Sequence, residues 1–171
     1  MVEVLRYKDE ADKSLGLAGM AISLVACDGE RYLASLSLEE GEEAFELTSE
    51  SFFGGNPRFS ARLVWNDLFV RFQLSSGLLL GNVLCRWRGA LPPAEVMDAV
   101  HDIVREEGSS ECSLDDDEIE NVYNKSLVFY RRLFGHRPVL DIADSFAAHL
   151  RHQRRMSAGE VFEFLSCLSR L

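Results

Sequence analysis

The sequence predicts a helix-dominated α+β protein, with an N-terminal antiparallel β-meander over about residues 18–49 packed on a bundle of five C-terminal helices. The chain has 171 residues and is 47% hydrophobic, which is enough for one ordinary core. Apolar residues alternate with a period of two before residue 53 and recur with helical spacing after residue 59. No repeat or Ser/Gly-rich tract marks a linker. We therefore expect a single domain over residues 1–171, which is β-rich over 1–53 and helical over 59–171.

The first predicted feature is a β-hairpin whose tip is Asp28-Gly29. Alternate apolar residues continue one face through this turn, and they are Met20, Ile22, Leu24 and Ala26 before it and Tyr32, Ala34, Leu36 and Leu38 after it. Phe45 and Leu47 predict a third strand. The alternative is a helix over residues 10–26 in an all-α multihelical protein, against which Gly16 and Gly19 each count by about 1 kcal/mol.

The same stretch has a second interpretation as a bacterial lipoprotein signal that ends at Cys27. Its apolar run has a suitable length and the small residue Ala26 precedes the cysteine. However, residues 1–14 carry a net charge of −1, whereas a signal begins with positive charge. The expected location is therefore cytoplasmic, and a lipoprotein lipidated at Cys27 is the alternative. The widely spaced cysteines are expected to be reduced structural thiols.

Five helices are predicted after residue 59. The first runs over about residues 60–88, although alternate apolar residues also allow a strand there, which would leave four helices. The second opens at Pro92-Pro93 and ends at Gly108. The third begins near Ser113 and ends at Gly135, the fourth runs from Val139 to about Arg155, and the fifth follows a capping box.

Two local patterns refine these helices. Gly77 and Gly81 lie four residues apart, which lets another backbone approach closely within the core. Ser157 and Glu160 form a Ser-x-x-Glu capping box before the last helix, and Ser113 with Asp116 comes close to one. The four carboxylates at 115–118 then lie at a helix start, where the helix dipole favours negative charge.

Charge is distributed unevenly along the chain, whose formal net charge is −10. Residues 1–124 contain 10 Lys/Arg and 24 Asp/Glu, whereas residues 125–171 contain 8 Lys/Arg and 4 Asp/Glu. The candidate basic patch in the second part consists of Arg131, Arg132, Arg137, Arg151, Arg154 and Arg155. Cations favour helix C-termini, which accounts for part of the patch. The rest predicts an anion site, a nucleic-acid contact or a surface for the acidic part of another copy.

The remaining candidate site is a group of metal-ligating residue types on the predicted helix after Pro138, and its members are Asp141, Asp144, His149 and His152. Helical phase does not make them converge, because Asp144 and His149 point about 140° apart. The sequence has neither a nucleotide-phosphate loop nor a G-x-S-x-G nucleophile motif. No cofactor is expected.

These observations lead to three functional hypotheses. The first is a non-catalytic protein-interaction or assembly module, acidic with a basic C-terminal patch, that binds a protein partner or itself as a homodimer. The second is a nucleic-acid-associated protein that uses the Arg/His patch, against which the net charge argues. The third is a metal-dependent enzyme with the helical Asp/His site. We expect no membrane partner and no enzymatic activity.

Overall fold

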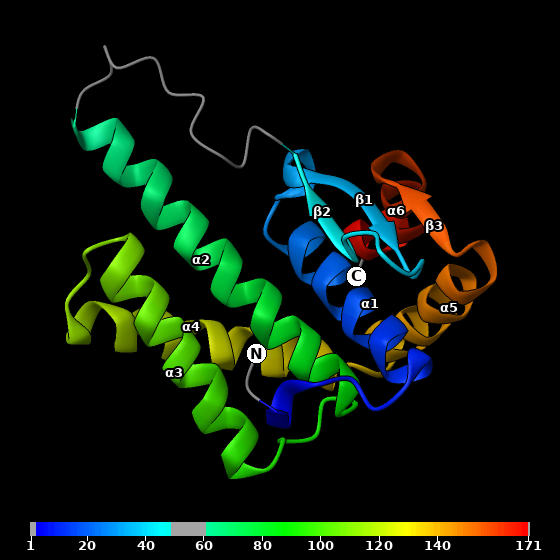
Figure 1. The fold of residues 1–171 in the computed structure, drawn as a ribbon, viewed down its shortest axis with the longest axis horizontal. Helices are drawn as coiled ribbons and strands as arrows, with labels where there is room; N and C mark the ends of the chain where they lie inside the picture. Colours follow the sequence, from blue (N-terminus) through cyan, green and yellow to red (C-terminus); the bar gives the residue numbers. More distant parts are fainter. Residues whose placement is uncertain (1–2, 49–60, 171) are drawn as a thin grey trace.

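The computed structural model describes residues 3–48 and 61–170 and places six α-helices and one three-stranded sheet in them (Figure 1). The helices are α1 (Glu10–Ala26), α2 (Ala61–Arg86), α3 (Ala94–Glu111), α4 (Asp116–Gly135), α5 (Arg137–Gln153) and α6 (Ala158–Leu165). The strands are β1 (Leu33–Ser37), β2 (Phe45–Leu47) and β3 (Arg155–Ser157). The helix-dominated α+β class and the five helices after residue 59 are therefore confirmed.

Residues 10–26 form helix α1, so the predicted first arm of a β-hairpin is wrong and the helical alternative for this segment is confirmed. Asp9 caps the helix, because its side chain accepts a hydrogen bond of 2.8 Å from the backbone N–H of Asp12. The helix packs against α2, α5 and α6, so that most of its faces are buried. In a helix that is buried on most faces, apolar residues occupy nearly every position, including the alternate ones that a strand would use. Periodicity alone therefore cannot distinguish such a helix from a strand.

Glycines bring the backbones of α1 and α2 together. A Cβ atom at Gly19 would overlap the carbonyl oxygen of Gly81, and one at Gly81 would overlap the Ser23 side chain. The predicted close backbone approach at Gly81 is therefore confirmed. The glycine that argued against a helix at residue 19 is instead what allows this helix to pack, since burial of the α1–α2 contact outweighs its low helix propensity.

Helix α2 covers the segment predicted as a helix over residues 60–88, and the strand alternative there is wrong. Phe72, Leu80 and Leu84 on its inner face are fully buried. Residues 68–86 are long and apolar enough to cross a membrane by length and composition, with a mean hydropathy of 1.4, but 56% of this stretch is buried against the other helices. It serves here as a core helix.

The sheet has the order β2-β1-β3, with both pairs antiparallel. Leu36 of β1 lies opposite Phe45 on one side and Met156 on the other, which confirms the predicted strand at residues 45–47. The third strand comes from the C-terminal part of the chain and not from residues 20–26. Helix α5 ends at Gln153, because Arg154 has a φ of 66° and turns the chain into β3. In the described part of the chain, β1 is the first strand and begins at Leu33. The prediction that residues 1–53 are β-rich is therefore wrong for residues 10–26, which form α1.

Two predicted helix ends are marked by glycines, with different outcomes. Gly135 is the last residue of α4, as predicted. Gly108 does not end α3, which continues to Glu111. A Cβ at Gly108 would lie 2.8 Å from Ile119 and 2.9 Å from Phe72, so this glycine lets α3 pack closely against α2 and α4.

The two predicted capping boxes also differ in outcome. Ser157 and Glu160 form the predicted box at the start of α6, with reciprocal side-chain and backbone hydrogen bonds. At the start of α4 the N-cap is Asp115, paired with Glu118, and not Ser113. Ser113 instead has a φ of 53° and belongs to the turn before the helix. The carboxylates at 115–118 do lie at a helix start.

Candidate functional site

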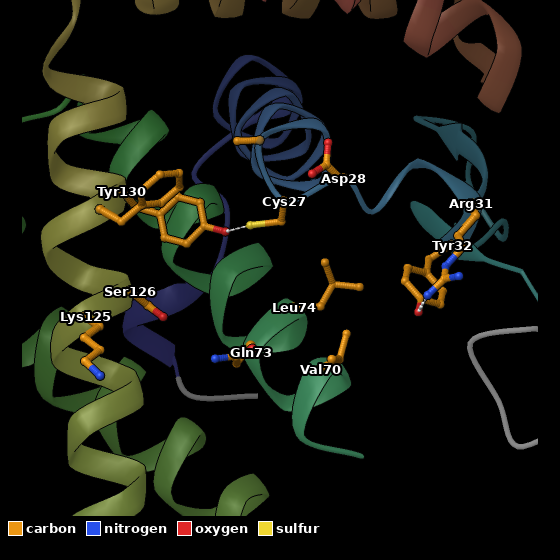
Figure 2. A pocket seen from close by; sticks show the side chains of 12 residues that line it. Cys27, Asp28, Arg31, Tyr32, Val70, Gln73, Leu74, Lys125, Ser126 and Tyr130 are labelled. Carbon is orange, nitrogen blue, oxygen red and sulfur yellow. Dashed lines mark hydrogen bonds between the residues drawn. The ribbon is translucent and has the colours of Figure 1, made fainter. Parts of the chain in front are cut away.

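A pocket opens between the C-terminal end of α1, the N-terminal half of α2 and the middle of α4. Its volume is about 460 Å³. The described residues that line it are Ala26, Cys27, Asp28, Arg31, Tyr32, Val70, Gln73, Leu74, Lys125, Ser126, Phe129 and Tyr130. In Figure 2 the α4 side chains stand on one side and Arg31 and Tyr32 on the other, with the α2 side chains between them. We call this cavity the α1–α2–α4 pocket.

Cys27 and Tyr130 meet at the α4 side of the pocket through a hydrogen bond of 2.9 Å between Sγ and Oη (Figure 2). Tyr130 is only 2% exposed, and Gly77 makes room for its hydroxyl, because a Cβ at Gly77 would overlap that oxygen. Burial, together with the hydrogen bond to Cys27, raises the pKa of Tyr130 far above its ordinary value. The hydroxyl therefore stays protonated and fixes the end of α1 against α4.

The opposite side of the pocket is built by the turn that follows α1. Asp28 has a φ of 51°, a left-handed conformation that Asp tolerates better than most residues. The N–H of Gly29 then returns to the carbonyl oxygen of Leu24 at 2.9 Å, which closes the helix end. The Arg31 guanidinium lies 4.7 Å from the centre of the Tyr32 ring and donates a hydrogen bond of 2.6 Å to its Oη.

Two exposed apolar side chains, Val70 and Phe129, line the pocket, and a third, Val128, is the neighbour of Phe129 in α4. Val70 on α2 is 44% exposed, and Val128 and Phe129 on α4 are 54% and 45% exposed. The Phe129 ring stands edge-on to that of Tyr130, with 5.0 Å between the ring centres. These three residues make up half of the large hydrophobic side chains that are exposed in the described part of the chain.

The six arginines of the predicted basic patch have different partners. Three of them pair with carboxylates: Arg137 with Asp141, Arg154 with Glu10 and Glu39, and Arg155 with Glu42. Arg151 donates a hydrogen bond of 3.1 Å to Ser14. Arg131 and Arg132 lie exposed on α4, and Arg132 also lines a second pocket beside Phe129.

The four candidate metal ligands are on α5, as predicted, but the structure does not bring them together. Asp141 pairs with Arg137, and Asp144 forms a two-pronged ion pair with Arg88. The His149 ring lies 5.2 Å from the ring of Phe164, and His152 is exposed. Among the side chains that the structure describes, no group of three or more His, Cys, Asp or Glu residues could hold a metal ion.

The sequence interpretation missed the α1–α2–α4 pocket, although one signal for it was available. The apolar stripe predicted for the helix at 116–135 consists of Ile119, Val122, Tyr123, Leu127, Tyr130, Leu133 and Phe134. Val128 and Phe129 are apolar but fall outside this stripe. Apolar residues on the outer face of an amphipathic helix indicate a contact beyond the core.

The fold and this pocket define the protein as a helix-dominated α+β protein with an open, largely apolar cleft between helices. In comparisons with known proteins, no family model matched the chain, and no curated protein or solved structure was significantly similar to it.

Proposed function

We propose that this protein is a non-catalytic interaction module that binds a protein partner, or a second copy of itself, through the α1–α2–α4 pocket and the exposed apolar side chains beside it. The observation that carries this proposal is that the exposed side chains of Val70 and Phe129 line an open cavity of about 460 Å³, with the exposed Val128 next to Phe129 in α4. Single exposed apolar residues are ordinary, whereas a group beside a cleft is typical of binding surfaces.

The surroundings of Cys27 support a binding role over a catalytic one. A nucleophilic thiol needs a base that takes its proton. Its hydrogen-bond partner, Tyr130, has a raised pKa and stays protonated, so it does not serve as that base. The described residues that line the pocket include no histidine, and Asp28 is their one carboxylate.

The first prediction concerns the double substitution Val128→Ser/Phe129→Ser, which removes the apolar character of the outer face of α4. We expect it to weaken the interaction by at least about 30-fold, since an aromatic anchor in a desolvated contact contributes about 2 kcal/mol or more. Light scattering over a range of protein concentrations measures self-association. Affinity capture from the native host, read by mass spectrometry, measures binding to a partner.

Leu91→Ser is the matched control, because Leu91 is 59% exposed but does not line the pocket. It should leave the interaction unchanged, and all variants should have the same melting temperature. A wild-type protein that stays monomeric at every concentration, and retains nothing that the double variant loses, would disprove the proposal.

A further inference from the structure

The α1–α2–α4 pocket adjoins two further hollows, and we call the three hollows together the groove. It shares Tyr32 and Leu74 with a smaller hollow of about 180 Å³ beside α3. It shares Phe129 with a hollow of about 460 Å³ at the junction of α4 and α5. Neighbouring hollows with common walls suit a segment that presents several apolar side chains in succession.

Three cations beside this groove, Arg31, Lys125 and Arg132, have no carboxylate partner among the residues that the structure describes, although acids outnumber Lys and Arg by ten in the whole chain. Neither Lys125 nor Arg132 forms an ion pair with any residue that the structure describes. Arg31 is bound to the ring and hydroxyl of Tyr32 and pairs with no described acid. Asp28 is the one described acid that lines the α1–α2–α4 pocket. By contrast, Arg137 at the start of α5 and Arg154 and Arg155 just after its end each pair with a carboxylate.

Over the three hollows, the described lining residues include four Lys or Arg side chains and two acids, Asp28 and Glu107. Glu107 lines the smaller hollow together with Arg71, and the Ser75 hydroxyl donates a hydrogen bond of 2.9 Å to the Glu107 carboxylate. The lining of the groove is therefore largely apolar and carries a net positive charge, whereas the whole chain has a formal net charge of −10.

We propose that the groove binds an acidic segment of a partner protein, whose large apolar side chains enter the hollows while its carboxylates pair with Arg31, Lys125 and Arg132. This inference rests on the proposed interaction function and specifies the partner. A carboxylate beside a partly desolvated cation adds specificity and speeds association, while the apolar side chains supply most of the affinity.

The same charges argue against a symmetric dimer through this face. In a two-fold contact a patch meets its own copy, so the net positive lining of one groove would face the same lining on the second copy. Like charges across an interface oppose association, whereas an acidic segment neutralises them. The groove therefore fits a foreign acidic segment better than it fits itself.

The test begins with selection from a display library of random peptides on the full-length protein. We expect the enriched peptides to combine Asp or Glu with Phe, Leu, Ile or Trp. The affinity of a selected peptide should fall by at least about tenfold in Lys125→Glu/Arg132→Glu. Val70→Trp, which fills the pocket without changing charge, should weaken binding in the same way. Lys8→Glu/Lys13→Glu is the matched control, since it reverses two charges outside the groove, and it should bind as the wild type does.

Native cysteines give an independent readout of position. Cys27 lines the pocket and Cys167 lies outside it, and both thiols are exposed, whereas Cys85 and Cys112 are buried. A bound peptide should protect Cys27 from alkylation by a maleimide and leave Cys167 reactive.

The outcomes separate this inference from the proposed function. Neutral or basic peptides that bind, protect Cys27 and are lost in Val70→Trp would overturn the acidic partner and leave the interaction function standing. A change in oligomeric state with Lys125→Glu/Arg132→Glu, in place of a change in peptide binding, would mean that a second copy occupies the groove. Failure to select any peptide that protects Cys27 would overturn the inference. The further absence of any effect of Val128→Ser/Phe129→Ser would overturn the interaction function too.

Discussion

Arg86 carries its charge where almost no water reaches it, since its side chain is 1% exposed. Its Nε and Nη2 donate hydrogen bonds of 2.9 and 2.7 Å to the two carboxylate oxygens of Asp12. Its remaining N–H groups reach the carbonyl oxygens of Leu5 and Arg6 and the side chain of Asn82. Burial alone would raise the pKa of Asp12, but the hydrogen bonds and charges around it outweigh burial and lower that pKa. The pair attaches the N-terminal segment to α2.

We predict that Arg86→Met lowers the free energy of unfolding by about 3–5 kcal/mol, because removal of one partner leaves a partly buried carboxylate and several carbonyl groups unsatisfied. Urea denaturation followed by circular dichroism measures the change. Arg105→Met is the control, since Arg105 and Asp116 form an exposed ion pair, with side chains 56% and 69% exposed, and should lose less than about 1 kcal/mol. Equal losses in the two variants would contradict the role assigned to Arg86.

Glu107 gives a prediction with a defined pH dependence. Burial raises its pKa above 4.5, its ordinary value, and the nearby Glu111 raises it further against the opposing effect of Ser75. The folded protein therefore binds this proton more tightly than the unfolded chain, and ionisation at higher pH costs stability. We expect Glu107→Gln to be more stable than the wild type at pH 7, with the difference disappearing as the pH falls below about 4.5. Melting temperatures between pH 3 and pH 7 measure it, and Glu106→Gln, at an exposed position, should show no such trend.

At the scale of elements, the contact between α1 and α2 decides how the N-terminal half folds. We predict that Gly19→Ala destabilises the protein by about 1–3 kcal/mol, because the added methyl group would overlap the backbone of Gly81. Gly159→Ala is the matched control within a helix: no atom lies within 4 Å of its added Cβ, so the higher helix propensity of Ala should stabilise the protein by up to about 1 kcal/mol. Thermal unfolding distinguishes the two signs, and a stabilising Gly19→Ala would contradict the packing described.

Elements with one solvent-facing side could be predicted from the sequence, because their apolar stripes have a clear period. Helix α4 and the capping box at Ser157 belong to this group. Helix α1 could not be assigned, since burial on most faces erases the period and leaves an alternation that a strand shares. Its glycines were counted for their propensity alone, whereas their packing partner lies some sixty residues further along the chain. Strand β3 was missed because Met156 is its one apolar residue and so shows no alternation, whereas the equally short β2 has Phe45 and Leu47.

At the scale of the whole molecule, folding brings part of the basic C-terminal segment into ion pairs with the acidic N-terminal segment. Arg154 and Arg155, from the basic C-terminal part, pair with Glu10, Glu39 and Glu42 from the acidic part. Sequence analysis identified these arginines but could not say which acids they meet. The candidate site was predicted least well, because its walls come from three elements far apart in sequence. Only the two apolar residues outside the stripe of α4 pointed to it.

The order of the strands also limits when the sheet can be completed. β1 pairs on one edge with β2, which follows it closely in sequence. Its other edge pairs with β3, which comes only after α5. During synthesis the N–H and C=O groups on that edge have no strand partner until residue 157 has left the ribosome, and an open edge invites pairing with other chains. A nascent chain that stops before Arg155 therefore lacks the strand that covers the second edge of β1, even if its helices have already formed.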